Sequence, residues 1–250
     1  MGAPSQLPYI EADPFSNHIG EPSDEVTGLT LAQASAQQGE TTSFNWVDDG
    51  KVITGKNQFS CGSCWVYAAA TEQESVQAIM DNASPVQLSE QEGLDCSDDG
   101  LTCETGGWRF LYWQMSKDYG SQAESGYPYE DEQGDCRNQE DKVVLSQAKS
   151  WNQVTGTIDG ITQILSRRPI SIAIEYDYDC WRWYESGVIS DCATGGGLYH
   201  DLVIVGRDQA EDGQNYWIGV NHWGDDWGMS GVFYIAAEEG DGVSKMNLYS

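Results

Sequence analysis

Seven cysteines limit the fold of this chain more than any other feature of its sequence. An odd number of cysteines in a chain that looks oxidised predicts three disulfides and one free thiol. The chain has 250 residues, enough for one domain or two joined lobes with a substantial hydrophobic core, so a small disulfide knot is excluded. The seven positions are Cys61, Cys64, Cys96, Cys103, Cys136, Cys180 and Cys192.

The segment Cys61-Gly62-Ser63-Cys64 has the spacing of a redox dithiol or of half a zinc site. The sequence has no second Cys-x-x-Cys, and its three histidines form no closely spaced pair, so we expect no metal and no cofactor. A redox dithiol of the thioredoxin kind follows a strand, whereas residues 57–60 are polar and loop-like. Both uses of the motif therefore rank low. The histidines are His18, His200 and His222.

The charge of the chain excludes two classes of partner. Its 12 Lys and Arg against 40 Asp and Glu give a net charge of −28. Nucleic acid and anionic lipid surfaces would repel such a protein, and no apolar run reaches the roughly 18 residues that span a bilayer. High-salt solubility, work in an acidic compartment and attraction of cationic substrates all suit this charge, and the sequence does not separate them.

The first half of the chain has mainly helical patterns. Residues 64–80 combine an alanine run with helically spaced apolar residues and contain no Gly or Pro, which predicts a helix that begins at Cys64. Residues 89–92 (SEQE) form the pattern of a capping box, which predicts a second, short helix. Residues 108–115 are compatible with a third helix. We expect a helical lobe over roughly residues 55–150.

The second half changes to β patterns. Apolar, β-branched and aromatic runs predict four strands. We therefore expect these strands to form a β lobe that consists of roughly residues 151–250 together with residues 42–54. The cleft between the lobes would bring Cys64 to face His200. A thiol at a helix N-terminus is favoured as a thiolate by the helix macrodipole, and an imidazole across the cleft would hold it as an ion pair. The predicted strands cover residues 170–174, 202–205, 216–220 and 231–235.

Several segments resemble one known family. Residues 58–65 (QFSCGSCW) are similar to the active-site segment of papain-like cysteine peptidases, the papain and cathepsin family. His200 and Asn221 follow Cys64 by 136 and 157 residues, against roughly 130–150 in the family signature. The resemblance runs from about Phe44 to Tyr249. Other matching segments are residues 88–96 (LSEQEGLDC), 103–107 (CETGG), 221–224 (NHWG) and 227–228 (WG).

The resemblance implies a catalytic role for individual residues. Cys64 would be the nucleophile and His200 its general base and acid. Asn221 would orient the imidazole, and Trp223 would shield the His200–Asn221 hydrogen bond from water. The Gln58 side-chain amide would bind the oxyanion together with the Cys64 backbone N–H. Each residue also has a structural interpretation: a buried cysteine, a structural histidine, or polar residues in turns. Their joint order and spacing favour the catalytic one.

The resemblance also implies the disulfide pairs. Cys61 would pair with Cys103, and Cys96 with Cys136. In papain the cysteine that corresponds to Cys192 pairs near the C-terminus, where this chain has Met246, so Cys180 is its expected partner. Cys64 would remain the free thiol.

The implied substrate cleft is mainly apolar. Asp201 stands where the family usually has Ala, and the sequence leaves open whether it lines the pocket for the substrate's P2 side chain or faces solvent. Gly106 and Gly107 would offer backbone hydrogen bonds to an extended peptide or protein substrate. The expected substrate-binding residues are Gly62, Gly106, Gly107, Trp108, Arg109, Ala173, Leu198, Asp201 and Trp223.

The resemblance implies an α+β fold of two lobes, one helical and one antiparallel and barrel-like, with the active site in the cleft between them. The implied activity is that of a cysteine endopeptidase, secreted or lysosomal or vacuolar, and residues 42–250 would be the peptidase. A catalytically silent scaffold or binding protein and an acyl transferase remain as alternatives. Residues 1–41 resemble the C-terminal part of a pro-region that occupies the cleft, or else are a tail without contacts.

Overall fold

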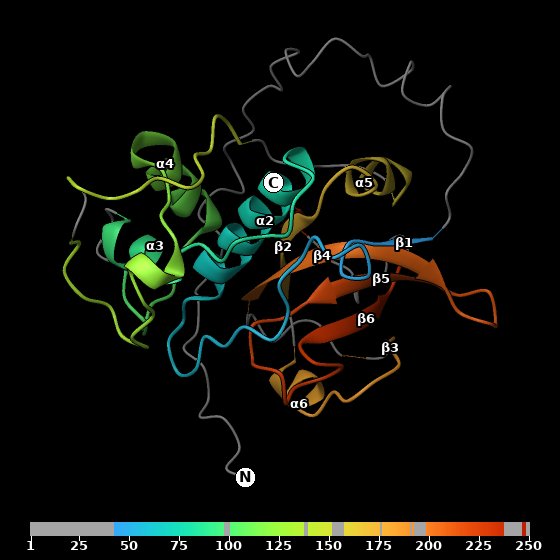
Figure 1. Ribbon diagram of the computed structural model, residues 1–250. Coiled ribbons are helices and arrows are strands. Elements are labelled where there is room, and N and C mark those ends of the chain that lie inside the picture. The colour runs from blue at the N-terminus through green and yellow to red at the C-terminus, as the bar shows by residue number, and fades with distance from the viewer. Residues whose placement is uncertain are drawn as a thin grey trace.

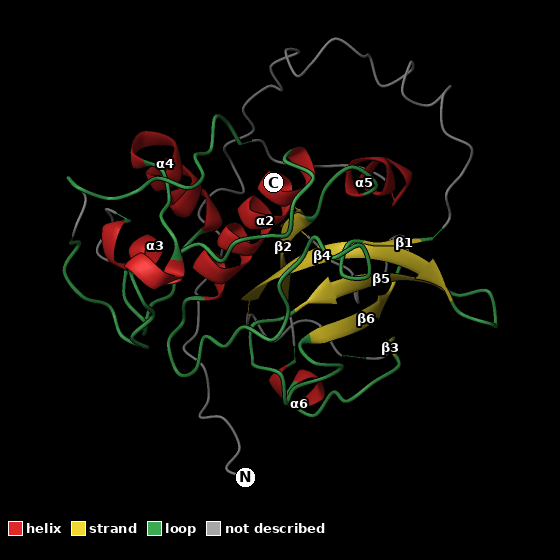
Figure 2. Ribbon diagram, in the orientation of Figure 1, coloured by secondary structure: helices red, strands yellow, loops and turns green. Residues whose placement is uncertain are grey.

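The structure is a computed structural model whose described residues are 43–97, 101–137, 140–151, 158–175, 177–190, 192, 199–237 and 247–248. The proposed pro-region, residues 1–41, lies outside the described residues. The two-lobe α+β fold is confirmed: helices α2 to α4 form one side of the molecule and a sheet forms the other (Figures 1 and 2).

The helical lobe contains the three predicted helices. They are α2 (Cys64–Met80), α3 (Glu90–Cys96) and α4 (Arg109–Tyr119), followed by a short 3-10 turn, Glu124–Gly126. Helix α2 has the predicted bounds, and its apolar first turns are buried on every side. Helix α4 ends at Gly120, which adopts a positive φ of 74°.

The predicted capping box of α3 forms only in part. Ser89 Oγ accepts a hydrogen bond from the Glu92 N–H at 2.9 Å, as an N-cap serine does. The reciprocal bond from Glu92 to the Ser89 N–H does not form, because that N–H donates to the Gln122 carbonyl oxygen. The Glu92 carboxylate instead binds the Gln122 N–H and the Lys142 ammonium. The capping residue was thus predicted correctly, but the partner of Glu92 was not.

The β lobe is a seven-stranded sheet in the order β3-β6-β5-β4-β2-β7, with β1 also paired to β4. The pairing is antiparallel except between β3 and β6, which are parallel, and the strands of the described residues do not close into a barrel. The strands are β1 (Phe44–Asn45), β2 (Ile170–Glu175), β3 (Val188–Ile189), β4 (Tyr199–Gln209), β5 (Asn215–Val220), β6 (Val232–Ala236) and β7 (Asn247–Leu248).

Two helices interrupt the β lobe, and the sequence analysis missed both. They are α5 (Ile158–Leu165) and α6 (Tyr178–Trp181). The spacing of Ile158, Ile161 and Leu165 is helical, and Ile161 and Leu165 pack into the core of this lobe. The signal for α5 was therefore present but was outweighed by the surrounding β patterns.

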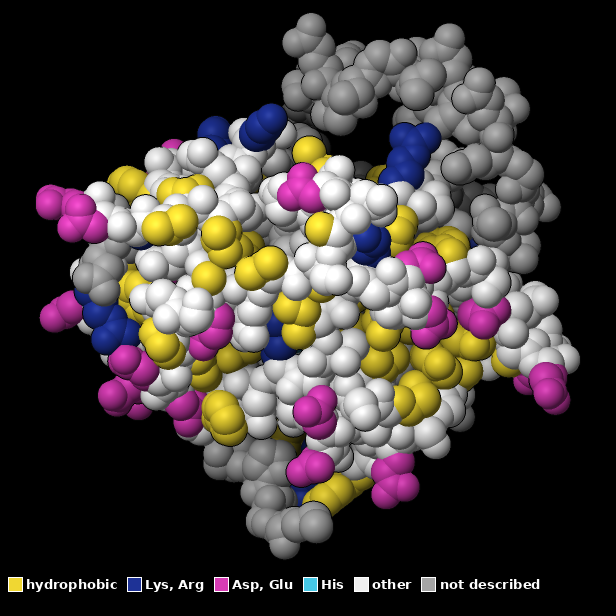
Figure 3. Space-filling view, in the orientation of Figure 1, with side chains coloured by type: hydrophobic (Ala, Val, Ile, Leu, Met, Phe, Trp, Pro, Cys, Tyr) yellow, Lys and Arg dark blue, Asp and Glu magenta, His cyan; other side chains and the backbone are white. Residues whose placement is uncertain are grey.

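Helix α2 lies between the helical lobe and the sheet (Figure 1). Trp65, Val66 and Ala69 pack against α4 residues in the core of the helical lobe, whereas Ala68 packs with Val203 of β4. The first turns of α2 are therefore apolar on both sides, which fixes the helix N-terminus at the junction of the two lobes. Carboxylates are spread over the face of the molecule in Figure 3 rather than gathered in one patch.

Candidate active site

Cys64 opens α2 and is the free cysteine among the described residues. Its side chain is buried, with 4% of its surface exposed. The side chain of Ser63, the N-cap residue, accepts no capping hydrogen bond from the helix, and its hydroxyl lies 2.8 Å from the Tyr129 hydroxyl. The first N–H groups of α2 therefore remain directed at the space around the thiol.

His200 and Asn221 meet in the β lobe. His200 Nε2 lies 2.8 Å from Asn221 Oδ1, and the His222 N–H donates to the same oxygen at 2.8 Å. The Trp223 ring stacks on the His200 ring with centroids 4.9 Å apart. The buried asparagine thus holds the buried imidazole, and the half-buried indole covers it.

The fold brings this group to the end of α2 that carries Cys64. Ala68, one turn after Cys64, packs in the same cluster as Val203, which lies three residues after His200. The segment before the helix is tied to the same strands, because Gln58 N–H donates to the His222 carbonyl oxygen at 2.9 Å. Asn57 also forms a bridge to Trp223. The structure thus joins His200 to Asn221 directly and places the first turns of α2 beside the strand that carries His200.

Burial disfavours the charged forms of both the Cys64 thiol and the His200 imidazole. It raises the pKa of the Cys64 thiol to about 12, although the Arg109 guanidinium and the N–H groups of Cys64 and Trp65 act in the opposite direction. Burial also lowers the pKa of His200 to about 4, against the effect of its hydrogen bond to Asn221. Each group taken alone is neutral at pH 7, so a thiolate–imidazolium pair requires the two charges to compensate each other.

Gln58 is fully buried beside the start of α2. Its Nε2 donates to the Cys61 carbonyl oxygen at 2.8 Å, and its Oε1 has no hydrogen-bond partner among the described residues. A primary amide carries two N–H hydrogens, so one remains for a further acceptor. The Tyr129 hydroxyl donates to the Gln58 backbone oxygen at 3.0 Å, which fixes the segment from the other side.

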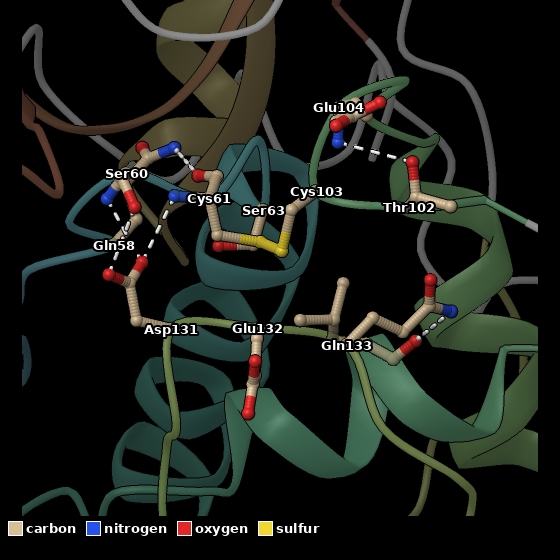
Figure 4. Close-up of a disulfide and its surroundings, with 12 residues drawn as sticks. Gln58, Ser60, Cys61, Ser63, Thr102, Cys103, Glu104, Asp131, Glu132 and Gln133 are labelled. Carbon is tan, nitrogen blue, oxygen red and sulfur yellow. Dashed lines mark hydrogen bonds between the residues drawn. A yellow bond between two sulfur atoms is a disulfide. The ribbon is translucent and has the colours of Figure 1, made fainter. Parts of the chain in front are cut away.

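Disulfides join Cys61 to Cys103, Cys96 to Cys136 and Cys180 to Cys192. The first of these connects the loop before Cys64 to the glycine-containing loop before α4, and the Gly62 N–H donates to the Cys103 carbonyl oxygen at 2.9 Å. Figure 4 shows this disulfide with Asp131 below it, whose carboxylate accepts hydrogen bonds from Ser60 and Cys61.

The expected pocket residues lie on both sides of the junction. Gly107 packs so closely on Trp65 that a Cβ at Gly107 would lie 2.4 Å from the indole, so no larger residue fits there. Trp108 is half-buried, and Ala173 of β2 lies opposite Asp201 of β4 in the sheet register. The remaining expected pocket residue, Leu198, lies outside the described residues.

Asp201 forms an ion pair with Arg109, the first residue of α4. Both side chains are buried, with 5% of the Arg109 and 7% of the Asp201 side chain exposed. Of the two alternatives that the sequence left open, the one in which Asp201 faces solvent is therefore wrong. The pocket is also not simply apolar with one acid, because this acid is paired with a base from the other lobe.

Sequence reasoning missed the residues that support the loop before Cys64. Tyr129 and Asp131 lie in an irregular segment about 65 residues later, and no motif or periodicity marks them. Lys56 was also missed: its ammonium lies 2.7 Å from oxygens of Glu74 and of Glu90 in the helical lobe. A scarce lysine in an acidic chain, eight residues before Cys64, was the one available signal.

Two further features bear on the class of site. In the part of the chain that the structure describes, no group of three His, Cys, Asp or Glu side chains is placed to hold a metal ion. The helices described there also include none that is both long and apolar enough to cross a membrane.

The geometry can be compared with known proteins. Residues 40–250 match the family described as papain family cysteine protease. The chain belongs to this family. It is 30% identical to cathepsin J of Mus musculus over 214 residues, which cover 82% of this chain and 64% of cathepsin J. It is 36% identical to the viral cathepsin of Choristoneura fumiferana nuclear polyhedrosis virus over 193 residues, 77% of this chain and 58% of that protein.

This papain-family chain therefore spans about three fifths of the length of these two curated relatives. Among solved structures, the bromelain protease from Ananas comosus in complex with the E64 inhibitor is similar with a TM-score of 0.74 and 30% identity, covering 81% of this chain and 92% of that one. Digestive procathepsin L2 from the Tenebrio molitor larval midgut has a TM-score of 0.80 and 27% identity, covering 99% and 77%. Both are papain-like proteases, in agreement with the two-lobe fold.

Proposed function

We propose that this chain is a cysteine endopeptidase that cleaves peptide bonds through a thioester on Cys64. The observation that carries this proposal is the His200–Asn221 contact of 2.8 Å under the Trp223 ring, at the junction of the lobes where the free thiol opens α2. A nucleophile, a base and a group that orients the base are the minimum set for covalent acyl transfer.

In the first step the proton of the Cys64 thiol moves to His200. Because Nε2 contacts Asn221, the proton is accepted by Nδ1. Burial opposes each charge alone, but a thiolate and an imidazolium formed side by side compensate each other, and the N-terminus of α2 adds to the stability of the thiolate. The sulfur then attacks the scissile carbonyl carbon, and the tetrahedral oxyanion forms.

The oxyanion is bound by the second N–H of the Gln58 amide and by the backbone N–H of Cys64. Full burial of Gln58 and its hydrogen bond to Cys61 support this assignment, because the amide is held in one orientation before substrate arrives. Collapse of the intermediate breaks the C–N bond, and the imidazolium gives its proton to the leaving amine. A water molecule, deprotonated by His200, then hydrolyses the thioester and restores the thiol.

The substrate lies extended across the junction of the lobes. On the strength of the family resemblance, we assign Gly106 and Gly107 to backbone hydrogen bonds with it and Gly62 to the floor beside the thiol. Trp108, Ala173, Arg109 and Asp201 form the side walls. The role of Leu198, outside the described residues, rests on the family resemblance alone.

Hydrolysis of a quenched fluorescent peptide tests the reaction. The wild-type protein should cleave it, Cys64→Ala should abolish cleavage, and Asn221→Ala should lower kcat by about 10-fold or more because the imidazole loses its orientation. The double variant Cys180→Ala/Cys192→Ala removes a disulfide of the β lobe and leaves the Cys64 thiol in place, so it is the control for the loss of sulfur elsewhere. Cleavage that survives Cys64→Ala would contradict the proposal.

Product analysis separates the two alternatives. An acyl transferase would yield an amide when an amine is added, in preference to the free acid that hydrolysis gives. A silent scaffold or binding protein would yield neither product, although it would still bind peptides. A free acid as the main product in the presence of amine supports the endopeptidase.

We also propose that residues 1–41 inhibit the peptidase of residues 42–250. The support is the resemblance to a pro-region and the similarity to a structure described as a procathepsin. Cutting the chain between Gln37 and Phe44 should raise its activity, and a chain that is fully active with residues 1–41 attached would contradict this. The three disulfides fit a secreted, lysosomal or vacuolar location, where disulfides persist.

A further inference from the structure

The loop that carries Gln58 has a strained backbone. Phe59, the next residue, has a φ of 49°, in the left-handed region that a bulky residue rarely adopts. Its side chain is 59% exposed, so packing of the ring does not hold this conformation. Backbone strain of this kind persists only where the surrounding structure over-determines it. The hydrogen bonds of the loop therefore decide how the Gln58 residue is oriented.

Two tyrosine hydroxyls bind successive carbonyl groups of this loop. The Tyr67 hydroxyl, from α2, donates to the Asn57 carbonyl oxygen at 2.9 Å. The Tyr129 hydroxyl donates to the Gln58 carbonyl oxygen at 3.0 Å, and the Cys61 N–H donates to the same oxygen at 3.3 Å. The two tyrosine rings pack edge to face, with centroids 5.2 Å apart. Tyr129 thus binds the peptide group directly before the strained residue.

The same Tyr129 hydroxyl contacts the residue before the nucleophile. It lies 2.8 Å from Ser63 Oγ. Burial raises the pKa of Tyr129, so the hydroxyl keeps its hydrogen, and because that hydrogen goes to the Gln58 carbonyl, the Ser63 hydroxyl donates to the tyrosine oxygen. Ser63 is fully buried, and its peptide bond to Cys64 carries the N–H assigned to the oxyanion. One hydroxyl therefore bridges Gln58, which carries one oxyanion donor, and Ser63, which directly precedes the other.

Tyr129 lies in a segment that is hydrogen-bonded on both sides of its ring. Its N–H donates to a Glu124 carboxylate oxygen at 2.8 Å. Asp131, labelled in Figure 4, accepts hydrogen bonds from the Ser60 N–H at 2.9 Å and from the Cys61 N–H at 3.1 Å. The segment that carries Tyr129 is therefore itself fixed to the loop before the nucleophile.

We propose that Tyr129 is a positioning residue for the oxyanion. Its hydroxyl fixes the spacing between the Gln58 side-chain amide and the Cys64 backbone N–H, so that both donors are in place before charge develops in the transition state. Without the hydroxyl, the peptide group before Phe59 can turn and relax the strain, which moves the amide. Tyr129 transfers no proton in this role. The inference rests on the proposed function, because it concerns the same reaction.

Tyr129→Phe removes the bridge and keeps the ring. Loss of a whole oxyanion donor lowers kcat by about 10²–10³, and Tyr129 acts only through the donors, so we expect kcat for a quenched fluorescent peptide to fall about 10-fold. KM should stay unchanged, because the oxyanion exists only in the transition state and the intermediate. Tyr127→Phe is the matched control: its hydroxyl, two residues earlier, donates to Asp95 at 2.8 Å, and kcat should remain at the wild-type value.

A second measurement separates positioning from a merely structural role. Exchange of Cys64 with dipyridyl disulfide requires the thiolate but forms no oxyanion, because the sulfur attacks a disulfide instead of a carbonyl. The exchange rate, and the pH at which it rises, should therefore be the same in Tyr129→Phe and in the wild type. Both assays use the full chain, before and after it is cut between Gln37 and Phe44.

A double variant tests whether Tyr129 acts through Gln58. Gln58→Ala removes the amide that is positioned, so adding Tyr129→Phe to it should lower kcat by less than about threefold. If Tyr129→Phe does not fold, Ser63→Ala decides in its place. It removes the other end of the bridge, and kcat should fall while disulfide exchange stays unchanged.

A wild-type kcat in Tyr129→Phe would overturn the inference, because the bridge would then not be needed. Disulfide exchange that slows in proportion to kcat would also overturn it, since the damage would then lie at the thiol or in the fold. So would effects of Gln58→Ala and Tyr129→Phe that multiply fully. A wild-type protein that undergoes exchange but hydrolyses no peptide, before or after cutting, would refute the proposed function and this inference with it. Hydrolysis that is equal in the wild type and in Tyr129→Phe would refute only the role of Tyr129.

Discussion

The two lobes use different means to fill their interiors. In the helical lobe, Lys56 Nζ lies 2.7 Å from both carboxylate oxygens of Glu74 and 2.7 Å from Glu90 Oε1, with all three side chains buried. A second buried pair joins Glu92 to Lys142. The core of the β lobe is apolar and aromatic, with isoleucines from β2 packed beside Trp181, Trp217 and Phe233.

This difference makes one lobe sensitive to pH. Two carboxylates share one lysine in the helical lobe. Burial, with the charge of Glu90, raises the pKa of Glu74 to about 7 against the effect of Lys56. Burial lowers the pKa of Lys56, but the two carboxylates outweigh it, so this pKa is raised. Burial likewise raises the pKa of Glu124 to about 7. The apolar core of the β lobe holds no such groups among the residues of its main cluster.

The largest expected effect comes from removing the shared cation. Lys56→Met leaves Glu74 and Glu90 buried without the ammonium and should lower the free energy of unfolding by about 3–5 kcal/mol. Thermal or urea unfolding measures this loss. Lys117→Met, which changes an exposed lysine of α4, is the matched control and should change stability by less than about 0.5 kcal/mol. Equal effects of the two variants would show that the buried cluster contributes no more than a surface charge.

The second effect is the pH dependence of stability. The folded pKa of Glu74, about 7, lies above its ordinary value of 4.5, so the folded state retains a proton that the unfolded state has released. Its contribution is therefore fully present below about pH 4.5 and is lost as the pH rises towards 7, by on the order of 3 kcal/mol. Urea unfolding at several pH values measures this slope.

Replacing the titrating group should flatten that slope. In Glu74→Gln the free energy of unfolding should decrease much less between pH 4.5 and pH 7 than in the wild type. In Glu104→Gln, which changes an exposed position, it should decrease as much as in the wild type. A slope that is unchanged in Glu74→Gln would assign the pH dependence to other groups.

The smallest effect is expected in the apolar lobe. Ile172→Val removes one buried methylene from β2 and should cost about 0.5–1.5 kcal/mol, because it leaves a small cavity. The cost should be the same at pH 4.5 and at pH 7. A cost that changes with pH would contradict the contrast between the two lobes.

The sequence predicted those parts of the fold that depend on local pattern. Helix α2 was predicted over its full length because its alanine run and helical spacing act together, and Ser89 was predicted as the N-cap of α3. The Glu92 side chain was predicted wrongly, since its partners Gln122 and Lys142 come from distant segments.

The same distinction applies to the site. The candidate nucleophile, base and orienting amide were found from motifs in the right order. The pairing of Arg109 with Asp201 was not, because it depends on two lobes meeting and neither residue carries a local signal for the other. The supports from Tyr129 and Asp131 were missed for the same reason.

The most direct test of the central claim is the mass of the protein after incubation with E-64 under mild reductant, with residues 1–41 removed. Cys64 should carry a single adduct, because it is the free thiol at the N-terminus of α2, and His200→Ala should slow this labelling strongly because the thiolate loses its partner. Peptide mapping locates the adduct. Absence of an adduct on Cys64, or equal labelling of the wild type and His200→Ala, would contradict an activated nucleophile built from both lobes.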